Sequence, residues 1–236
     1  MLPDRRKTSM EVGGMNDDLL SKAVRNNSNW CDLICATHGI ETQFLQNVWL
    51  TKSPVPNYYP NLITLNSETK AEEISEISLD HFSIKDSFGK LNLGYAGFSK
   101  LFDASWIGLE NKRNETSNID SWEKLSLDEE LTAWENAWGN TMDQKIFLPN
   151  LLLEPQVGIY AKKEGAGIVA GFITFDSDGV ISVSNFFNYT KKEIWPEIIN
   201  IIDADKPLVG YEKGEDLEYA KGAGFEEIGR VTIWKK

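Results

Sequence analysis

The most regular hydrophobic pattern in the chain is a block of apolar runs in its second half. Three runs stand out, Val157–Ala161, Ile168–Phe175 and Val180–Phe187. They are separated by KKEGAG and DSDG, two short segments built on glycine and aspartate. Segments of this kind connect antiparallel strands through tight turns. The block therefore predicts three consecutive strands joined as hairpins.

The glycines of this block have a spacing that also occurs in nucleotide-binding loops. Gly165, Gly167 and Gly171 follow one another closely, but a phosphate-binding loop needs a helix directly after it. The pattern after Gly171 remains that of a strand. We therefore predict a hairpin turn at the first two glycines and a packing glycine at Gly171.

A helical pattern precedes the block, in the segment SLDEELTAWENAWGN. Leu131, Trp134, Ala137 and Trp138 fall on one face of this helix, at the spacing that burial against a core requires. We interpret them as a core stripe. The alternative is that the two tryptophans line a ligand cleft.

The segments after the block predict a helix, a strand, a second helix and a last strand. NYTKKEIWPEIINIID reads as a helix whose regular part begins near Pro196, because proline is favoured in the first helical turn. PLVGYE is a short apolar strand, and GEDLEYAKGAG is a helix that ends at glycines. FEEIGRVTIWKK supplies the final strand or hairpin.

The first half of the chain has weaker signals. A helix is expected from Asp18 to Gly39, divided in two at Asn26–Ser28. TQFLQNVWLT, LITL, KLNLGYAG and DASWIGLE are expected to form strands, and the acidic segment NSETKAEEISEISLD a helix or loop. The polar stretch Glu110–Trp122 is the best candidate for a boundary. The expected organisation is a tail at 1–18, an α/β module at 19–115 and a second domain at 116–236.

Composition narrows the classes of function. The 236 residues carry a net charge of −12 and no extended basic cluster, so nucleic acid and anionic membranes are disfavoured as partners. The N-terminus lacks the apolar segment of a secretory signal, and no apolar run reaches the length needed to span a bilayer. A hydrophobic content of 41% is ample for a packed core. We expect a folded cytoplasmic protein.

The chain has only two cysteines, Cys31 and Cys35, which share one helical face beside His38. A metal or redox site is one interpretation, but a metal site needs more ligands, and His81 is the only other histidine. We favour two buried thiols on an apolar helix face, in a reducing compartment.

The order of elements from Asp128 to Trp234 resembles that of the GNAT acyltransferase family. The segment AKGAGFEEIG, in which a helix ends at Gly224-Phe225, is similar to the usual close of that family. The resemblance implies an α/β (α+β) fold with a mixed, mostly antiparallel central sheet flanked by helices. The N-terminal α/β module at 19–115 is an addition to it, either related to it in fold or part of one continuous domain. It also implies acetyl-CoA as the acyl donor and an amine as the acceptor.

The resemblance assigns acetyl-CoA binding to the end of the third strand of the hairpin block. Ser184, Asn185, Phe186 and Phe187 would offer backbone groups to the pantetheine arm, with a strand amide in this region stabilising the oxyanion. The turn after this strand carries a Gln/Arg-x-x-Gly-x-Gly/Ala signature in the family. This chain has SNFFNYTKKEIWPEII there, without glycine. In its place Lys191 and Lys192 would supply charge near a phosphate.

The same resemblance identifies two candidate catalytic residues. Glu212, at the end of the PLVGYE strand, would accept a proton from the amine. Tyr219 would protonate the leaving thiolate, although the family places its tyrosine at the position that Ala220 occupies here. A helical residue one position away points about 100° elsewhere.

Two hypotheses about function follow. The first is an acyl-CoA-dependent N-acyltransferase that acts on an amine. The second is a catalytically silent protein of the same fold that binds a small molecule or a protein partner, and a homo-oligomer is compatible with either. A β-rich glycan- or peptide-binding module, suggested by the eight tryptophans, agrees less well with the helical segments.

Overall fold

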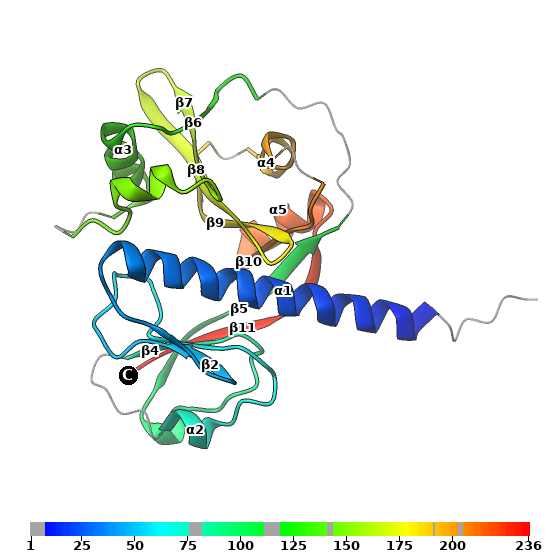
Figure 1. Ribbon diagram of the computed structural model, residues 1–236. Coiled ribbons are helices and arrows are strands. Elements are labelled where there is room, and N and C mark those ends of the chain that lie inside the picture. Colours follow the sequence, from blue (N-terminus) through cyan, green and yellow to red (C-terminus); the bar gives the residue numbers. More distant parts are fainter. Residues whose placement is uncertain (1–7, 76–81, 111–118, 141–143, 191, 203–204) are drawn as a thin grey trace, which may run out of the picture.

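The computed structural model describes residues 8–75, 82–110, 119–140, 144–190, 192–202 and 205–236. Within these ranges the strands form one sheet in the order β1-β2-β3-β4-β11-β5-β10-β9-β8-β7-β6 (Figure 1). The strands are β1 (Gln43–Phe44), β2 (Val48–Leu50), β3 (Leu62–Thr64), β4 (Ser83–Asp86), β5 (Ser99–Leu109), β6 (Trp122–Lys124), β7 (Val157–Glu164), β8 (Gly167–Ser177), β9 (Val180–Asn188), β10 (Leu208–Glu212) and β11 (Glu226–Lys235). The helices are α1 (Thr8–Thr37), α2 (Ala71–Ser75), α3 (Asp128–Trp138), α4 (Trp195–Ile201) and α5 (Gly214–Gly222), with short 3-10 turns at Gly94–Ala96 and Pro149–Leu153.

The two halves of the chain repeat one pairing pattern. In the first half β1 and β2 pair antiparallel, as do β2 and β3, and β3 then pairs parallel with β4. In the second half β7, β8, β9 and β10 pair in the same sequence of directions. A helix joins the parallel strands in each half, α2 in the first and α4 in the second. The fold is therefore duplicated, although the sequence shows no repeat.

Each half receives its last strand from the other half. β5, which closes the first half in sequence, pairs antiparallel with β10 of the second half. β11, which closes the second half, pairs antiparallel with β4 of the first. The exchanged strands also pair with each other over most of their length. Segments 19–115 and 116–236 thus contribute strands to one continuous sheet.

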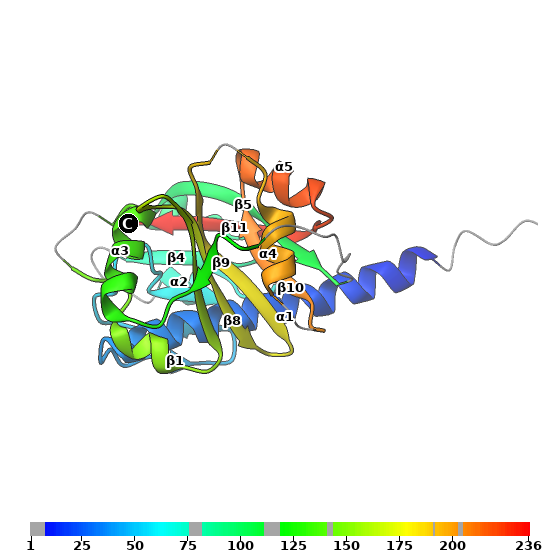
Figure 2. The same cartoon turned by 90° about the horizontal axis from the view of Figure 1, so that it is seen from above.

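Helices cover both faces of this sheet (Figure 2). On one face α1 packs against the centre, where Val24 contacts a cluster that includes Trp106 and Val231. On the opposite face α4 and α5 bury Ile198 and Ala220 against the second half of the sheet. α2 packs against the first half in a separate cluster.

Helix α1 is a single helix, so the predicted division at Asn26–Ser28 is wrong. All three residues are buried. The Asn26 side-chain amide donates to the Phe175 carbonyl oxygen, at 2.9 Å, at the end of β8. The Asn27 side chain accepts a hydrogen bond of 2.8 Å from Lys85 of β4. Polar residues that suggested a break instead fasten the helix to both halves of the sheet.

Several predicted elements are confirmed. The hairpin block forms β7, β8 and β9, with a positive φ at Gly165 in the first turn. Leu131 and Trp134 of α3 are buried in the core as predicted, and Trp138 is half-buried against Tyr58. The strand expected at KLNLGYAG is wrong, since this segment is irregular with one 3-10 turn. Part of the acidic segment, residues 76–80, and His81 lie outside the described residues.

The two cysteines are buried, as we expected for structural thiols. Burial raises the pKa of Cys31 to about 11 and that of Cys35 to about 12, which leaves both thiols protonated and unreactive at neutral pH. Within the described ranges, no set of three histidine, cysteine, aspartate or glutamate residues is placed to hold a metal ion. In the same ranges no helix combines the length and apolar content of a membrane crossing.

A substitution at Gly171 tests the tight packing between α3 and the sheet. A Cβ at this position would overlap the Trp134 indole and the Phe187 ring. We expect Gly171→Ala to lower the free energy of unfolding by about 1–3 kcal/mol because the core becomes overpacked. For a chain of this length, the melting temperature should fall by about 2–4 °C for each kcal/mol of stability lost. Gly167→Ala is the matched control in the same strand, since the nearest atom to its Cβ is 3.9 Å away. Equal melting temperatures for the two variants would contradict the packing role.

A substitution at Asn26 tests how firmly α1 is attached to the sheet. We expect Asn26→Ala to cost about 1–3 kcal/mol of unfolding free energy, because it removes the buried amide that donates from α1 to the Phe175 carbonyl oxygen. Chemical denaturation measures the loss. Ser21→Ala, on an exposed turn of the same helix, bonds only within the helix and should change stability by less than about 0.5 kcal/mol. An equal loss in both variants would exclude a specific role for the Asn26 contact.

Candidate functional site

The parallel strands β9 and β10 separate shortly after they meet. Their pairing ends at Ser182 opposite Val209. β10 continues along β5 as far as Glu212, whereas β9 continues along β8 as far as Asn188. The end of β9 therefore has no strand partner on the β10 side. A free strand edge presents amide and carbonyl groups in an extended row.

A β-bulge lies in this free part of β9. The β8–β9 register shifts between Gly171 and Ile173, and neither Asn185 nor Phe186 has a partner in it. Asn185 has a φ of 50°, in the left-handed region that non-glycine residues seldom adopt. A bulge interrupts the regular ladder and redirects backbone groups, so the pairing of β9 with β8 is irregular in this segment as well.

Two buried polar atoms near the free edge have no hydrogen-bond partner among the described residues. They are the Ser184 hydroxyl on β9 and the indole nitrogen of Trp195 at the start of α4. The Trp195 ring stacks on Phe186 with 5.2 Å between ring centres. Buried polar groups are nearly always paired. Their position beside an unpaired strand edge fits a polar ligand that runs along β9.

The turn after β9 is arranged differently from a phosphate cradle. The Thr190 amide donates to the Asn188 side chain at 3.0 Å, and the Lys192 amide donates to the Thr190 hydroxyl at 3.2 Å. These two amides are already satisfied, Pro196 has no amide hydrogen in the first turn of α4, and α4 has only seven residues. Lys192 is exposed and Lys191 lies outside the described residues. The turn does not fit a pyrophosphate group.

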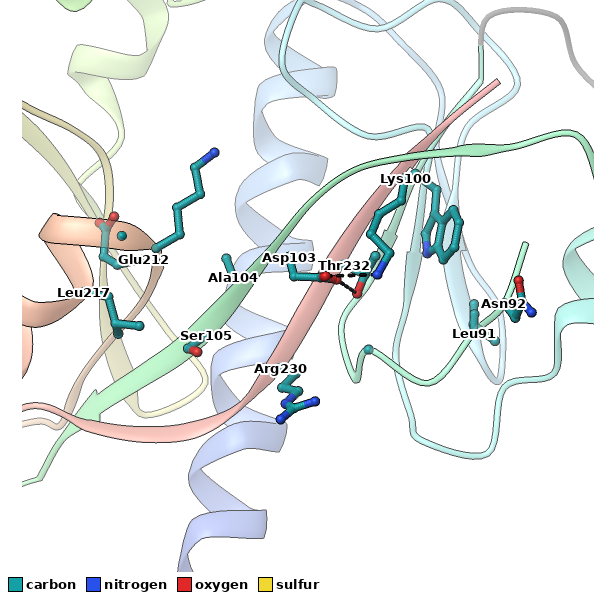
Figure 3. A pocket seen from close by; sticks show the side chains of 14 residues that line it. Leu91, Asn92, Lys100, Asp103, Ala104, Ser105, Glu212, Leu217, Arg230 and Thr232 are labelled. Atoms are coloured by element: carbon teal, nitrogen blue, oxygen red, sulfur yellow. Dashed lines mark hydrogen bonds and ion pairs between the residues drawn. The ribbon is translucent and has the colours of Figure 1, made fainter. Parts of the chain in front are cut away.

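A groove opens on the sheet face opposite α1 (Figure 3). Its floor is formed by β5 and β11, one wall by the end of β10 and the start of α5, and the other wall by the segment after β4. The cavity volume is about 610 Å³, in the range of small-molecule sites. The lining residues are Gly89, Leu91, Asn92, Lys100, Asp103, Ala104, Ser105, Glu212, Lys213, Gly214, Leu217, Arg230, Thr232 and Trp234.

Glu212 stands where the free edge and the groove meet. It is the last residue of β10, and its partly buried side chain lines the groove with no hydrogen-bond partner among the described residues. Burial, and secondarily the carboxylate of Asp216, raises the pKa of Glu212 to about 8. A carboxyl group with such a pKa near neutrality suits general acid–base chemistry.

The remaining charges of the groove are partly paired. Lys100 forms an ion pair of 2.9 Å with Asp103, and the Thr232 hydroxyl donates to the same carboxylate at 2.6 Å. These contacts lower the pKa of Asp103. The Arg230 guanidinium, by contrast, forms no hydrogen bond or ion pair with any described residue. The groove thus has a neutralised end at Lys100 and an available cation at Arg230.

Tyr219 lies away from this groove. The side chain is 43% exposed on the outer surface of α5, in a shallow depression with Glu215 and Glu218. Ala220, the neighbouring position, is fully buried against the sheet. The structure therefore places Ser184–Phe187 on the free part of β9 and Glu212 in the lining of the groove, and it leaves Tyr219 outside that lining. The role of Tyr219 as an acid remains a prediction.

Sequence reasoning missed the floor of the groove. Asp103 and Ser105 of β5, and Arg230 and Thr232 of β11, are alternate residues that point to one face. Polar residues at alternate positions of a strand signal a solvated face, and this signal was available in both segments. That the two strands are neighbours depends on pairing between distant parts of the chain.

Comparisons with known proteins agree with this architecture. No protein-family model matches the sequence, and no curated protein sequence matches it. Among solved structures, a GCN5-related N-acetyltransferase from Kribbella flavida superposes with a TM-score of 0.57 at 11% identity, over 91% of this chain and 95% of its own. A conserved protein of unknown function from Staphylococcus epidermidis gives 0.58 at 11% identity, over 84% and 94%. A putative acetyltransferase from the GNAT family, from Novosphingobium aromaticivorans, superposes with a TM-score of 0.55 at 10% identity, over 87% of this chain and 94% of its own.

The fold is therefore that of the GCN5-related N-acetyltransferases, with a divergent sequence. The mixed, mostly antiparallel sheet flanked by helices is confirmed. At these identities the likeness concerns the fold alone.

The raised pKa of Glu212 makes a prediction about stability. In the folded protein the carboxyl holds its proton up to about pH 8, whereas in the unfolded chain it ionises near its ordinary value of 4.5. The folded state therefore binds more protons between these two pH values, so the contribution of Glu212 to stability falls as the pH rises through this window. We expect Glu212→Gln to gain stability relative to wild type over the window and the difference to level off above about pH 8. Urea denaturation of both proteins at a series of pH values measures this difference in stability. A difference that does not change with pH would contradict the raised pKa of Glu212.

Proposed function

We propose that this protein transfers an acyl group from an acyl-CoA thioester to an amine. The observation that carries the proposal is the free edge of β9 beyond Ser182. The pantetheine arm of CoA contains two amides in an extended chain, and an extended chain can add to a strand edge through main-chain hydrogen bonds. The unpaired Ser184 hydroxyl and Trp195 indole would supply further contacts.

The residues of the opening suit acyl transfer. Acyl-CoA supplies the acyl group as a thioester. In the reaction the amine nitrogen bonds to the acyl carbon, the carbon–sulfur bond breaks, the amine loses a proton and the CoA thiol gains one. Backbone amides of the bulge at Asn185 and Phe186 are candidates to stabilise negative charge on the acyl oxygen.

Glu212 is the candidate general base. An amine is a nucleophile only without its extra proton, so the site needs a group that accepts a proton near neutral pH. Glu212, with its pKa raised to about 8, meets this need once ionised. Its position supports this role, because it ends β10, the strand that pairs with β9 as far as Ser182.

Recognition of the donor would rest on the pantetheine arm. The amides of Thr190 and Lys192 already donate to side chains of the same turn, which argues against a pyrophosphate held there. This same feature favours the second candidate function, a silent protein that retains the scaffold and binds a different small molecule or a protein partner.

Binding of thioesters distinguishes the two candidates. We expect calorimetric titration to show that acetyl-CoA and S-acetyl-pantetheine bind with affinities within about tenfold of each other. If the protein held the pyrophosphate of acetyl-CoA by charge-assisted hydrogen bonds, acetyl-CoA would bind more than tenfold tighter than S-acetyl-pantetheine, because each such bond contributes about 1.5–3 kcal/mol. Absence of heat and of any thermal shift with either compound at millimolar concentration would sink the transferase and leave the silent protein.

A pair of serine variants locates the donor. We expect Ser184→Ala to weaken thioester binding, by about fivefold for one hydrogen bond, and to leave the free protein as stable as wild type or slightly more so. Ser182→Ala, on the same strand, removes a hydroxyl that already donates to Phe175 at 3.4 Å. It should reduce stability slightly and leave thioester affinity unchanged. Equal affinities for both variants would place the donor elsewhere.

A further inference from the structure

We propose that the groove between α5 and the segment after β4 binds a small primary amine that also carries a carboxylate, with the ammonium group at Glu212 and the carboxylate at Arg230. The binding site stands on its own observations. That this ligand is the acyl acceptor rests, in addition, on the proposed function.

The two binding groups lie in one row across three strands. Glu212 of β10 is the register partner of Ser105 on β5, and Ser105 is the partner of Arg230 on β11. Side chains in such a row point to the same face of a sheet. Neighbouring strands are about 4.8 Å apart, so the two outer backbones are separated by roughly 10 Å. Glu212 and Arg230 therefore lie on the two sides of Ser105, and both line the groove (Figure 3).

Arg230 is a cation of the groove whose guanidinium has no ion pair with any described residue. Lys100 is paired with Asp103, and the Lys213 ammonium lies 4.2 Å from the centre of the Phe102 ring. Arg230 lies close enough to Asp103 and Glu227 to help lower their pKa values, but it forms no ion pair with either. Glu227 instead pairs with Lys221, at 2.9 Å. The planar guanidinium is suited to bind a carboxylate through two parallel hydrogen bonds.

Arg230 is also confined by the wall of the groove. Gly89 passes so close that a Cβ there would lie 3.0 Å from the Arg230 Cβ. Gly89 has a φ of 60°, which a residue with a side chain rarely adopts. The segment after β4 thus limits the space around the base of the arginine, whereas the residue as a whole is exposed.

Glu212 supplies the carboxyl group that would bind the ammonium end of the ligand. Its carboxyl has no partner among the described residues and faces the same floor. The charged groups around it are Asp216 on α5, Lys213 next to it on the chain, and Arg230 two strands away. An ammonium group would favour the ionised carboxylate, because opposite charges stabilise each other. The groove has room for more than the two charged ends, and Leu91, Leu217 and Trp234 line the remaining space.

The test uses the full chain without any acyl-CoA, so donor binding does not enter it. We would titrate 15N-labelled protein with 4-aminobutanoate, glycine and 6-aminohexanoate by NMR, with butylamine and butanoate as single-charge controls. We expect at least one aminocarboxylate to bind more tightly than either control and to shift the amides of Ser105 and Gly214. Arg230→Gln should weaken its binding about 10- to 100-fold, the range of a charge-assisted contact, and leave butylamine unaffected.

Two further variants complete the test. Lys235→Gln removes a cation from the same strand, outside the groove lining, and should leave the affinity unchanged. In wild type the affinity for 4-aminobutanoate should rise about tenfold from about pH 7 to about pH 9, as Glu212 ionises, and Glu212→Gln should show no such rise. The proposal is overturned if no aminocarboxylate binds at millimolar concentration. It is also overturned if binding survives both Arg230→Gln and Glu212→Gln in protein shown to be folded by circular dichroism.

Discussion

The arrangement of this protein depends on buried polar contacts between α1 and both halves of the sheet. Asn26 donates to the end of β8 in the second half, and Asn27 accepts from Lys85 in the first. Unpaired polar groups in a core are costly, so these contacts fix the rotation of the helix as well as its position along the sheet. Lys85 also donates to the Tyr211 hydroxyl at 3.3 Å. The contacts behind the sheet thus hold the end of β10, where the next residue, Glu212, points to the opposite face.

One short strand connects the two parts of the candidate site. β10 borders the free edge of β9 on one side and the floor of the groove on the other. Gly210 lets it approach β9 before the strands separate, since a Cβ there would lie 2.9 Å from the Val183 carbonyl oxygen. Two residues later, Glu212 faces the groove. A thioester along β9 and an amine in the groove would therefore meet at the same carboxyl group.

Much of the second half could be predicted because each element has its own signal. The apolar runs and glycine turns of β7, β8 and β9 are local, and so is the Gly224-Phe225 turn before β11. Features that depend on distant partners could not be predicted. Asn26–Ser28 looks like a helix break until Phe175 and Lys85 are known to satisfy it. Glu212 was predicted from its place at a strand end, but its raised pKa comes from burial by the folded chain. Arg230 became a candidate only because β11 lies beside β5.

The exchange of last strands between the halves has a consequence for synthesis. β11 lies between β4 and β5, which are made more than a hundred residues earlier. The first half therefore leaves the ribosome before β11, the ten-residue strand that pairs with both β4 and β5, has been made. Vectorial folding of one half after the other is excluded for the centre of this sheet, and contacts of such long range make folding slow. Until β11 has been made, the edges of β4 and β5 that it joins lack their common partner, and unpaired strand edges are sites where chains associate wrongly.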